Sequence, residues 1–125
     1  MNGRTVLDSS ALLAFLQGEA GAQQVEAALL AGAVCGAANW SEVAQKVLHH
    51  NASWELAKGA LANYGLAVEA VTSADAEAAA AMWSSAPSLS LADRLCLALA
   101  DRLNAPALTA DRAWLAASPQ AQSIR

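Results

Sequence analysis

The chain has 125 residues, of which 56% are hydrophobic and 14% are charged. This length suits one continuous core, so we predict a single domain over residues 1–125. The net charge of -4 excludes the broad basic surface of proteins that hold nucleic acids mainly through phosphate contacts. No apolar run reaches the roughly eighteen residues of a membrane span, and no secretion signal opens the chain, so we expect a cytoplasmic protein.

The first half of the chain alternates short apolar segments with helical patterns. We predict a strand over 4–8, helices over 9–18 and 20–32, and a strand over 33–36. Further helices are expected from Asn39 to His50 and from Trp54 to Tyr64, before a strand over 66–71.

The second half continues the same alternation. An alanine-rich helix is predicted from Thr72 to Ser85, followed by a regular helix over 89–103, a strand over 106–110 and a short helix over 111–117. The polar residues from Pro119 onward predict a partly mobile tail. Strands alternating with helices indicate an α/β fold, in which a mostly parallel sheet is covered on both faces.

The two cysteines, Cys35 and Cys96, lie far apart and outside any CxxC or Cys/His spacing. This argues against both a disulfide framework and a zinc site. We expect both thiols to be ordinary buried side chains.

Four acidic residues occupy positions from which side chains of a parallel sheet can reach a bound ligand. Asp8 ends the first predicted strand, and Asp111 directly follows the last one. Residues just past the carboxyl ends of parallel strands line a shared crevice. Asp93 at the start of a helix and Glu42 in the first turn of another can point at the same crevice. Because converging carboxylates repel each other, this placement predicts a bound Mg2+ or Mn2+ ion.

A metal ion held by these acids has an evident use. It polarises a phosphodiester, lowers the pKa of a bound water and stabilises charge on the leaving oxygen. The predicted reaction is therefore metal-assisted phosphodiester hydrolysis. Either Glu42 or Asp8 could orient the attacking water.

Helix capping offers a simpler explanation for each acid. Asp93 with Ser90, and Glu42 with Asn39, fit the capping-box pattern, while the other two acids could be N-caps. Asp75 has similar helix-start chemistry with no strand end nearby, and we assign it no function. Taken singly, each acid is better explained as a cap, and only their joint placement favours a metal site.

Four segments of the chain carry a resemblance to a known family: VLDSSALLAFL, NWSEVAQKV, LSLADRLCLALA and LTADRAW. In this order they resemble the PIN domains, and among these the VapC-like toxin ribonucleases of bacterial toxin–antitoxin pairs. The resemblance implies a PIN-like three-layer sandwich with about four to five short strands and about seven helices.

The resemblance also implies an activity and a set of partners. It implies an endoribonuclease in which Asp8, Asp93 and Asp111 hold Mg2+ or Mn2+, Glu42 completes the site and Thr109 supports it by hydrogen bonding. It further implies a homodimer that is kept inactive by a small antitoxin encoded beside it.

The few basic and aromatic residues suggest limited contact with a substrate. Arg94 and Arg112 follow two of the acids, and Arg4 and Lys46 lie near others, so any phosphate contacts would come from these. For Arg94 and Arg112 we expect surface pairing with neighbouring acids instead. The four tryptophans are expected to be core or interface anchors rather than platforms for bases.

Other functions fit the sequence less well. A phosphatase of the HAD type needs a second aspartate two positions after Asp8, where this chain has Ser10. A dinucleotide-binding protein is disfavoured because no GxGxxG follows the first strand. The remaining alternatives are a PIN-like scaffold that only binds a protein, and an RNA-processing PIN nuclease without a toxin role.

Overall fold

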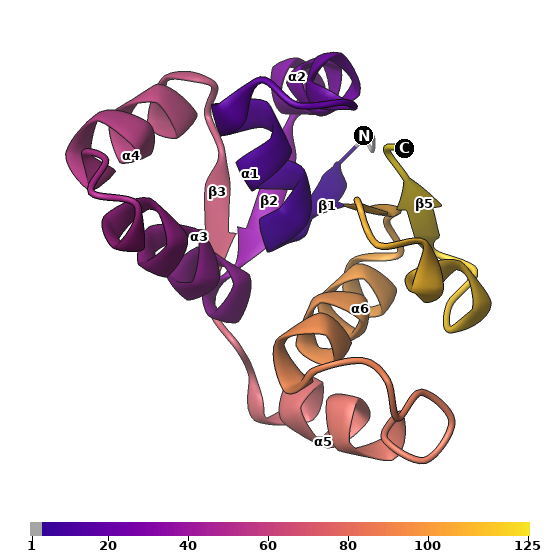
Figure 1. Ribbon diagram of the computed structural model, residues 1–125. Helices are drawn as coiled ribbons and strands as arrows, with labels where there is room; N and C mark the ends of the chain where they lie inside the picture. The colour runs from indigo at the N-terminus through magenta and orange to yellow at the C-terminus, as the bar shows by residue number, and fades with distance from the viewer. Residues whose placement is uncertain (1–3) are drawn as a thin grey trace.

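The computed structural model describes residues 4–125 and contains a five-stranded sheet in the order β3-β2-β1-β4-β5 (Figure 1). The strands are β1 (Thr5–Leu7), β2 (Ala33–Gly36), β3 (Ala67–Glu69), β4 (Ala107–Thr109) and β5 (Ala121–Ser123). Every neighbouring pair runs parallel. The carboxyl ends of the strands therefore lie along one edge of the sheet, as the sequence predicted.

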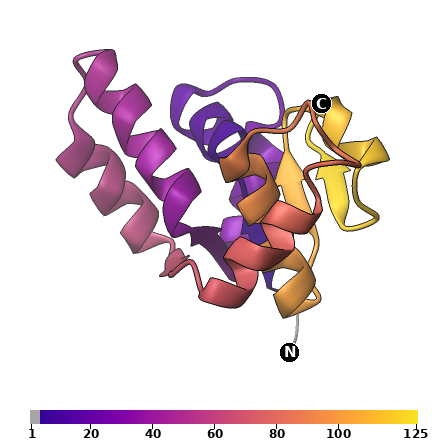
Figure 2. The same ribbon diagram turned by 90° about the horizontal axis from the view of Figure 1, so that it is seen from below.

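Helices cover both faces of this sheet (Figure 2). They are α1 (Ser9–Gln17), α2 (Ala22–Ala31), α3 (Ala37–His49), α4 (Trp54–Asn63), α5 (Ser73–Ala81), α6 (Leu91–Leu103) and the 3-10 helix η1 (Arg112–Ala116). Helices α1 to α4 lie on one face, while α6 covers the other and α5 packs against α6. The predicted α/β sandwich is confirmed.

The strands are apolar on both sides because each side meets a separate layer of helices. In β1, Leu7 packs into the core formed with α1 to α4, and its neighbour Val6 packs into the core formed with α6. The same alternation separates Leu108 from Ala107 in β4. Successive side chains of a strand point to opposite faces, so a three-residue strand can contribute to both cores.

Helix α3 begins earlier than the sequence predicted. Its N-cap is Gly36, the last residue of β2, so the helix already runs from Ala37. Asn39 is therefore not a cap and lies inside the helix, where the residue is 1% exposed. Because the start moves back, Glu42 lies beyond the first turn of α3 rather than within it.

The end of the chain also differs from the prediction. Residues after Pro119 form β5, which pairs in parallel with β4, instead of a mobile tail. Ile124 is buried, and its backbone N–H donates to the Thr109 carbonyl at 3.0 Å. A Cβ added to Gly21 would lie 2.6 Å from the Ile124 carbonyl oxygen, so only glycine permits this close approach. The polar composition concealed a three-residue edge strand.

Helix α5 and the tryptophans give smaller corrections. Helix α5 ends at Ala81 rather than Ser85, with Met82 as its C-cap. Trp114 is fully buried, and Trp40 packs edge-on against Trp54 with ring centroids 4.9 Å apart, as expected of core anchors. Trp83 is 62% exposed and belongs to neither core. Cys35 and Cys96 are free and buried, as predicted.

Over residues 4–125, the structure contains no helix that is both long enough and apolar enough to cross a membrane.

Candidate functional site

Each of the four predicted acids lies either just past the carboxyl end of a strand or in the first half of a helix. Asp8 directly follows β1, and Asp111 lies two residues after β4, the neighbour of β1 in the sheet. Glu42 lies in α3, which continues from β2, and Asp93 lies in the first turn of α6. The topology thus directs four positions that are spread over most of the sequence toward one edge of the sheet, without joining them in a compact cluster.

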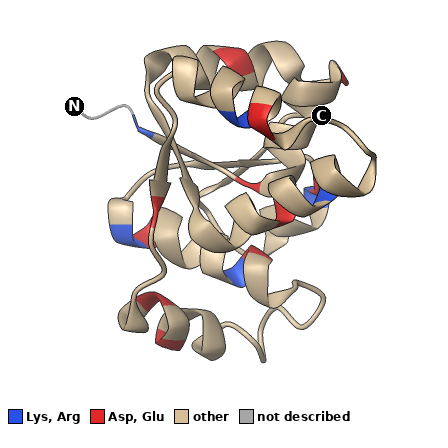
Figure 3. Cartoon of the chain, turned by 90° about the vertical axis from the view of Figure 1, so that its left-hand side faces the viewer, with Lys and Arg blue, Asp and Glu red and all other residues tan. Residues whose placement is uncertain are grey.

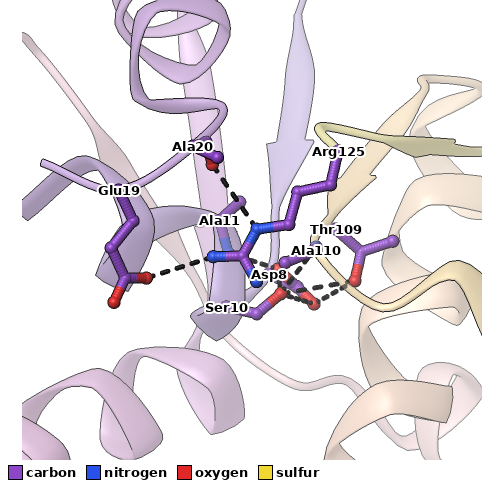
Figure 4. A network of polar contacts seen from close by, with 8 residues as sticks. All are labelled: Asp8, Ser10, Ala11, Glu19, Ala20, Thr109, Ala110 and Arg125. Atoms are coloured by element: carbon purple, nitrogen blue, oxygen red, sulfur yellow. Dashed lines mark hydrogen bonds and ion pairs between the residues drawn. The ribbon is translucent and has the colours of Figure 1, made fainter. Parts of the chain in front are cut away.

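Asp8 is held by hydrogen bonds from both sides of the edge (Figure 4). As the N-cap of α1, it accepts a bond from the Ala11 N–H to Oδ1 at 2.7 Å. The Ser10 hydroxyl lies 2.7 Å from Oδ1, and the Thr109 hydroxyl donates to Oδ2 at 2.7 Å. Arg125 appears in the same view but binds Glu19, at 3.1 Å, rather than Asp8. The Asp8 carboxylate is therefore fixed in place by uncharged donors.

Burial dominates the electrostatics of Asp8. The residue is 3% exposed, and desolvation raises the pKa of its carboxyl group from 3.8 to about 6. The hydrogen bonds from Ala11, Thr109 and Ser10 oppose this rise in pKa, while the negative charge of Asp93 adds a small further increase. A nearby cation would lower the pKa of Asp8 again.

Glu42 is oriented by a second set of donors. Its Oε1 accepts a hydrogen bond from the Ser9 hydroxyl at 2.9 Å and another from Asn39 Nδ2 at 3.2 Å. Asn39 Nδ2 also contacts the Ala92 carbonyl at 3.4 Å, which links α3 to the start of α6. The Oδ1 atom of Asn39 is buried and has no hydrogen-bond partner among the described residues. The expected capping box between Asn39 and Glu42 is replaced by a bond between their side chains.

Asp93 and Asp111 serve as helix caps in this structure. Asp93 completes a capping box with Ser90, receiving the Ser90 N–H at Oδ2 at 3.0 Å. Asp111 is the N-cap of η1 and accepts from the Ala113 N–H at 2.9 Å. The capping explanation is thus confirmed for Asp8, Asp93 and Asp111. Capping does not exclude a further role, because each of these carboxylates has a second oxygen or a free lone pair.

The acids interact electrostatically but do not form a compact cluster. The pKa of the Cys96 thiol is raised first by burial and also by the charges of Asp8, Asp93 and Glu42, so all three act on one buried point. Within residues 4–125, however, no three His, Cys, Asp or Glu side chains lie close enough together to hold a metal ion. The donors are chemically suited to Mg2+ or Mn2+, but Asp93 and Asp111 are turned toward their own helix ends.

The basic residues are mostly engaged elsewhere. Arg94 donates to the Ala79 carbonyl at 2.7 Å and Arg112 to the Arg125 carbonyl at 3.2 Å, so the expected pairing of both with acids is wrong. Arg4 lies 3.7 Å from Glu69. Figure 3 shows basic positions scattered singly along the ribbon on the face that it draws. Lys46 is exposed and lies on α3 one turn after Glu42.

Comparison with known proteins assigns the fold to a family. The family profile of the PIN domain matches residues 5–118. The chain belongs to the PIN domain family. PIN domains are in general nucleases. The match spans all four acids described above.

Solved structures agree with this PIN assignment. A chain of a toxin–antitoxin complex from Klebsiella pneumoniae is similar, with 20% identity and a TM-score of 0.79, over 97% of this chain and 98% of that one. The protein PAE2754 from Pyrobaculum aerophilum is similar with 17% identity and a TM-score of 0.70, over 97% of this chain and 83% of that one. At these identities the likeness shows the fold alone. No curated protein sequence matches the chain.

Three residues at the sheet edge of this PIN domain were not predicted as site residues: Ser9, Ser10 and Asn39, the last of which had been paired with Glu42 only as a cap. Each donates a hydrogen bond to one of the four acids. Ser10 follows the strand-ending Asp8 by two positions, a spacing from which its hydroxyl can turn back to that aspartate, whereas Ser9 donates to the distant Glu42 and has no such local signal. Asn39 could have been found from its position one helical turn before Glu42, once the helix start at Ala37 is known.

Proposed function

We propose that this PIN domain is a Mg2+- or Mn2+-dependent endoribonuclease in which Asp8, Glu42, Asp93 and Asp111 are the catalytic residues. The observation that carries this proposal is the buried Asp8 carboxylate. It lies at the carboxyl edge of the sheet, has uncharged partners only, and has a raised pKa of about 6. Strongly perturbed carboxyl groups in such places are typical of functional sites.

Asp8, Asp93 and Asp111 would hold the metal ion, and Glu42 would complete the site. When bound, the ion would polarise a phosphodiester and lower the pKa of a water molecule. Asp8 is already oriented for this role by Ser10 and Thr109. Asp93 and Asp111 would have to share or exchange their capping bonds, at 3.0 and 2.9 Å, to contribute. Glu42, which is oriented by Ser9 and Asn39 and caps no helix, would orient the attacking water.

The ends of the RNA products test this mechanism. The purified chain, without any partner, is incubated with total RNA in Mg2+, in Mn2+ and in EDTA, and the cut ends are mapped. We expect internal cuts that leave a 5′-phosphate and a 3′-hydroxyl, because water rather than the ribose 2′-hydroxyl attacks. Cyclic-phosphate ends, or cleavage that continues in EDTA, would refute the mechanism.

We further propose that the chain is the cytoplasmic toxin of a toxin–antitoxin pair and that it forms a homodimer. The similar Klebsiella pneumoniae chain comes from a toxin–antitoxin complex, which supports a protein partner. Exposed apolar side chains support protein contacts as well, since Leu56 is 76%, Leu30 73% and Trp83 62% exposed. A basic side chain of the antitoxin would complement the acids at the sheet edge.

Purification from the native host tests the partner. We expect a small protein to copurify, expression of the chain alone to slow growth, and light scattering to report a dimer at micromolar concentration. A chain that purifies alone and leaves growth unaffected would refute the toxin role. It would leave a role in RNA processing if cleavage persists. Metal binding without cleavage would instead favour a PIN-like scaffold.

A further inference from the structure

Two hydroxyl groups, one from α1 and one from β4, form hydrogen bonds with the Asp8 carboxylate. Ser10 Oγ, in the first turn of α1, lies 2.7 Å from Asp8 Oδ1 and 2.9 Å from Oδ2. Thr109 Oγ1, at the end of β4, donates to Oδ2 at 2.7 Å. The two hydroxyl oxygens are themselves 3.4 Å apart (Figure 4). Asp8 thus lies against a pair of hydroxyls rather than a single one.

Each hydroxyl also accepts a bond from the turn that follows β4. The Ala110 N–H donates to Ser10 Oγ at 2.8 Å, and the Asp111 N–H donates to Thr109 Oγ1 at 3.0 Å. A hydroxyl has one proton, so accepting from a backbone N–H leaves that proton free for the carboxylate. Two parallel paths therefore run from the Asp8 carboxylate through a hydroxyl to the backbone at Ala110 and Asp111.

Ser10 differs from Thr109 in where it originates. Thr109 belongs to the same strand and turn as Asp111, so its bond to the Asp111 N–H is local. Ser10 comes from α1, a hundred positions earlier, and its contact with the Ala110 N–H joins α1 to the turn after β4. A helix cap alone requires neither this contact nor the bond to Asp8, because Asp8 already caps α1.

We propose that Ser10 is a positioning residue for the nuclease site. Its hydroxyl fixes the Asp8 carboxylate relative to the turn that carries Asp111, so the two acids are set at one distance before a metal ion arrives. This inference rests on the proposed function. Removing the hydroxyl leaves Asp8 buried and still bonded to Thr109 but uncouples it from the Ala110 backbone.

Variants of the full chain at Ser10 test this role. For Ser10→Ala we expect kcat for RNA cleavage in Mg2+, and the affinity for Mg2+ measured by calorimetry, each to fall about 10–100-fold, as is usual when a partner that orients a metal ligand is lost. KM should change little, because Ser10 faces Asp8 and not the substrate. Ser10→Thr keeps the hydroxyl and should restore both quantities.

Ser53→Ala is the matched control. Ser53 caps α4 by accepting the Leu56 N–H at 3.1 Å, away from the acids. This variant should lower the melting temperature while leaving kcat and Mg2+ affinity unchanged. In the double variant Ser10→Ala/Thr109→Val, the loss of kcat should differ from the product of the single losses, because both hydroxyls act on one carboxylate.

The outcomes separate this inference from the proposed function. If the wild type binds Mg2+ but does not cleave RNA, the proposed function fails, and the Mg2+ affinities alone decide the role of Ser10. The inference would be overturned if Ser10→Ala had the same kcat and the same Mg2+ affinity as the wild type. It would also be overturned if Ser10→Thr lost as much kcat and Mg2+ affinity as Ser10→Ala. A wild type indifferent to Mg2+ would overturn both.

Discussion

Two buried aspartates in this chain have opposite surroundings. Asp8 is 3% exposed and Asp75 is 4% exposed, and each accepts a hydrogen bond at the start of a helix. Asp75 is also paired with Arg102, whose Nε and Nη2 donate to its two oxygens at 2.9 and 3.0 Å. This pairing lowers the pKa of Asp75, whereas burial raises the pKa of Asp8 to about 6.

The difference lies in how each charge is neutralised. The fold supplies a cation to Asp75, and the pair ties α5 to α6. No lysine, arginine or histidine within residues 4–125 forms a salt bridge with Asp8. The negative charge of Asp8 can instead be neutralised by a proton or by a cation bound from solution. An acid that is unfavourable for the folded state and lies at the sheet edge is typical of groups retained for function.

Cleavage should show the largest difference between the two aspartates. Asp8→Asn removes a proposed metal ligand, and a metal ion contributes several kcal/mol to the transition state, so RNA cleavage should fall at least ~10²-fold. Asp75→Asn should leave kcat near the wild-type value, because Asp75 faces Arg102 rather than the proposed site. Both variants are assayed in Mg2+ well below their melting temperatures. Equal loss in both would remove the functional distinction.

The pH dependence of stability should also differ in sign. The pKa of Asp8 rises from 3.8 to about 6 on folding, which corresponds to a loss of roughly 3 kcal/mol at neutral pH. The protonated Asp8 carboxyl group does not carry this cost, so the corresponding stability of the fold is fully present below the unfolded pKa of 3.8 and is lost as the pH rises through about 6. In EDTA, wild type should therefore lose stability relative to Asp8→Asn over this range.

Asp75 should behave in the opposite way over a lower range. Its pKa is lowered on folding, so its stabilising contribution is present above 3.8 and is lost as the pH falls below that value. Chemical denaturation at several pH values, with Asp8→Asn and Asp75→Asn compared with wild type, measures both slopes. A wild type and Asp8→Asn that run parallel from about pH 4 to about pH 7 would contradict the raised pKa.

Breaking the ion pair should have a smaller effect. Arg102→Ala leaves a nearly buried Asp75 without its cation, although the Arg102 side chain is 35% exposed. We expect a loss of roughly 1–3 kcal/mol in the free energy of unfolding, between the values for exposed and fully buried pairs. Denaturant unfolding measures it, and Arg112→Ala, which breaks only a 3.2 Å bond to the Arg125 carbonyl, is the control. Similar losses in both variants would show that the pair does not stabilise the fold.

The sequence predicted the elements well where local signals and tertiary packing agree. The strand before Asp8, the helix whose C-cap is Gly32 and the capping box of Asp93 all have strong local signatures. The predicted start of α3 was wrong because Asn39 has the chemistry of a cap but is buried against Glu42 and the Ala92 carbonyl. Strand β5 was not predicted because pairing with β4 stabilises it, while its own three residues carry no apolar pattern.

The candidate site was only partly predictable for a related reason. The four acids follow from the order of strands and helices, which the sequence carries. Their orientation does not, because it depends on Ser9, Ser10 and Asn39, which meet the acids only after folding. Asp75 shows the same limit. Its helix-start chemistry was visible, but its pairing with Arg102 across 27 positions was not.

Asp93→Asn gives the smallest expected effect, and it decides between capping and metal binding. Asp93 receives the Ser90 N–H, and its charge adds only the smallest contribution to the raised pKa of Asp8. In EDTA the variant should therefore be less stable by about 0.3–1 kcal/mol, as expected when a charge at a helix N-terminus is lost. In excess Mg2+ the gap should widen, because wild type gains RT ln(1 + [L]/Kd) from the ion and the variant gains less. Thermal melts of both proteins in both buffers measure this change. An equal gap in EDTA and Mg2+, with a wild type that does not respond to the ion, would leave Asp93 a helix cap and nothing more.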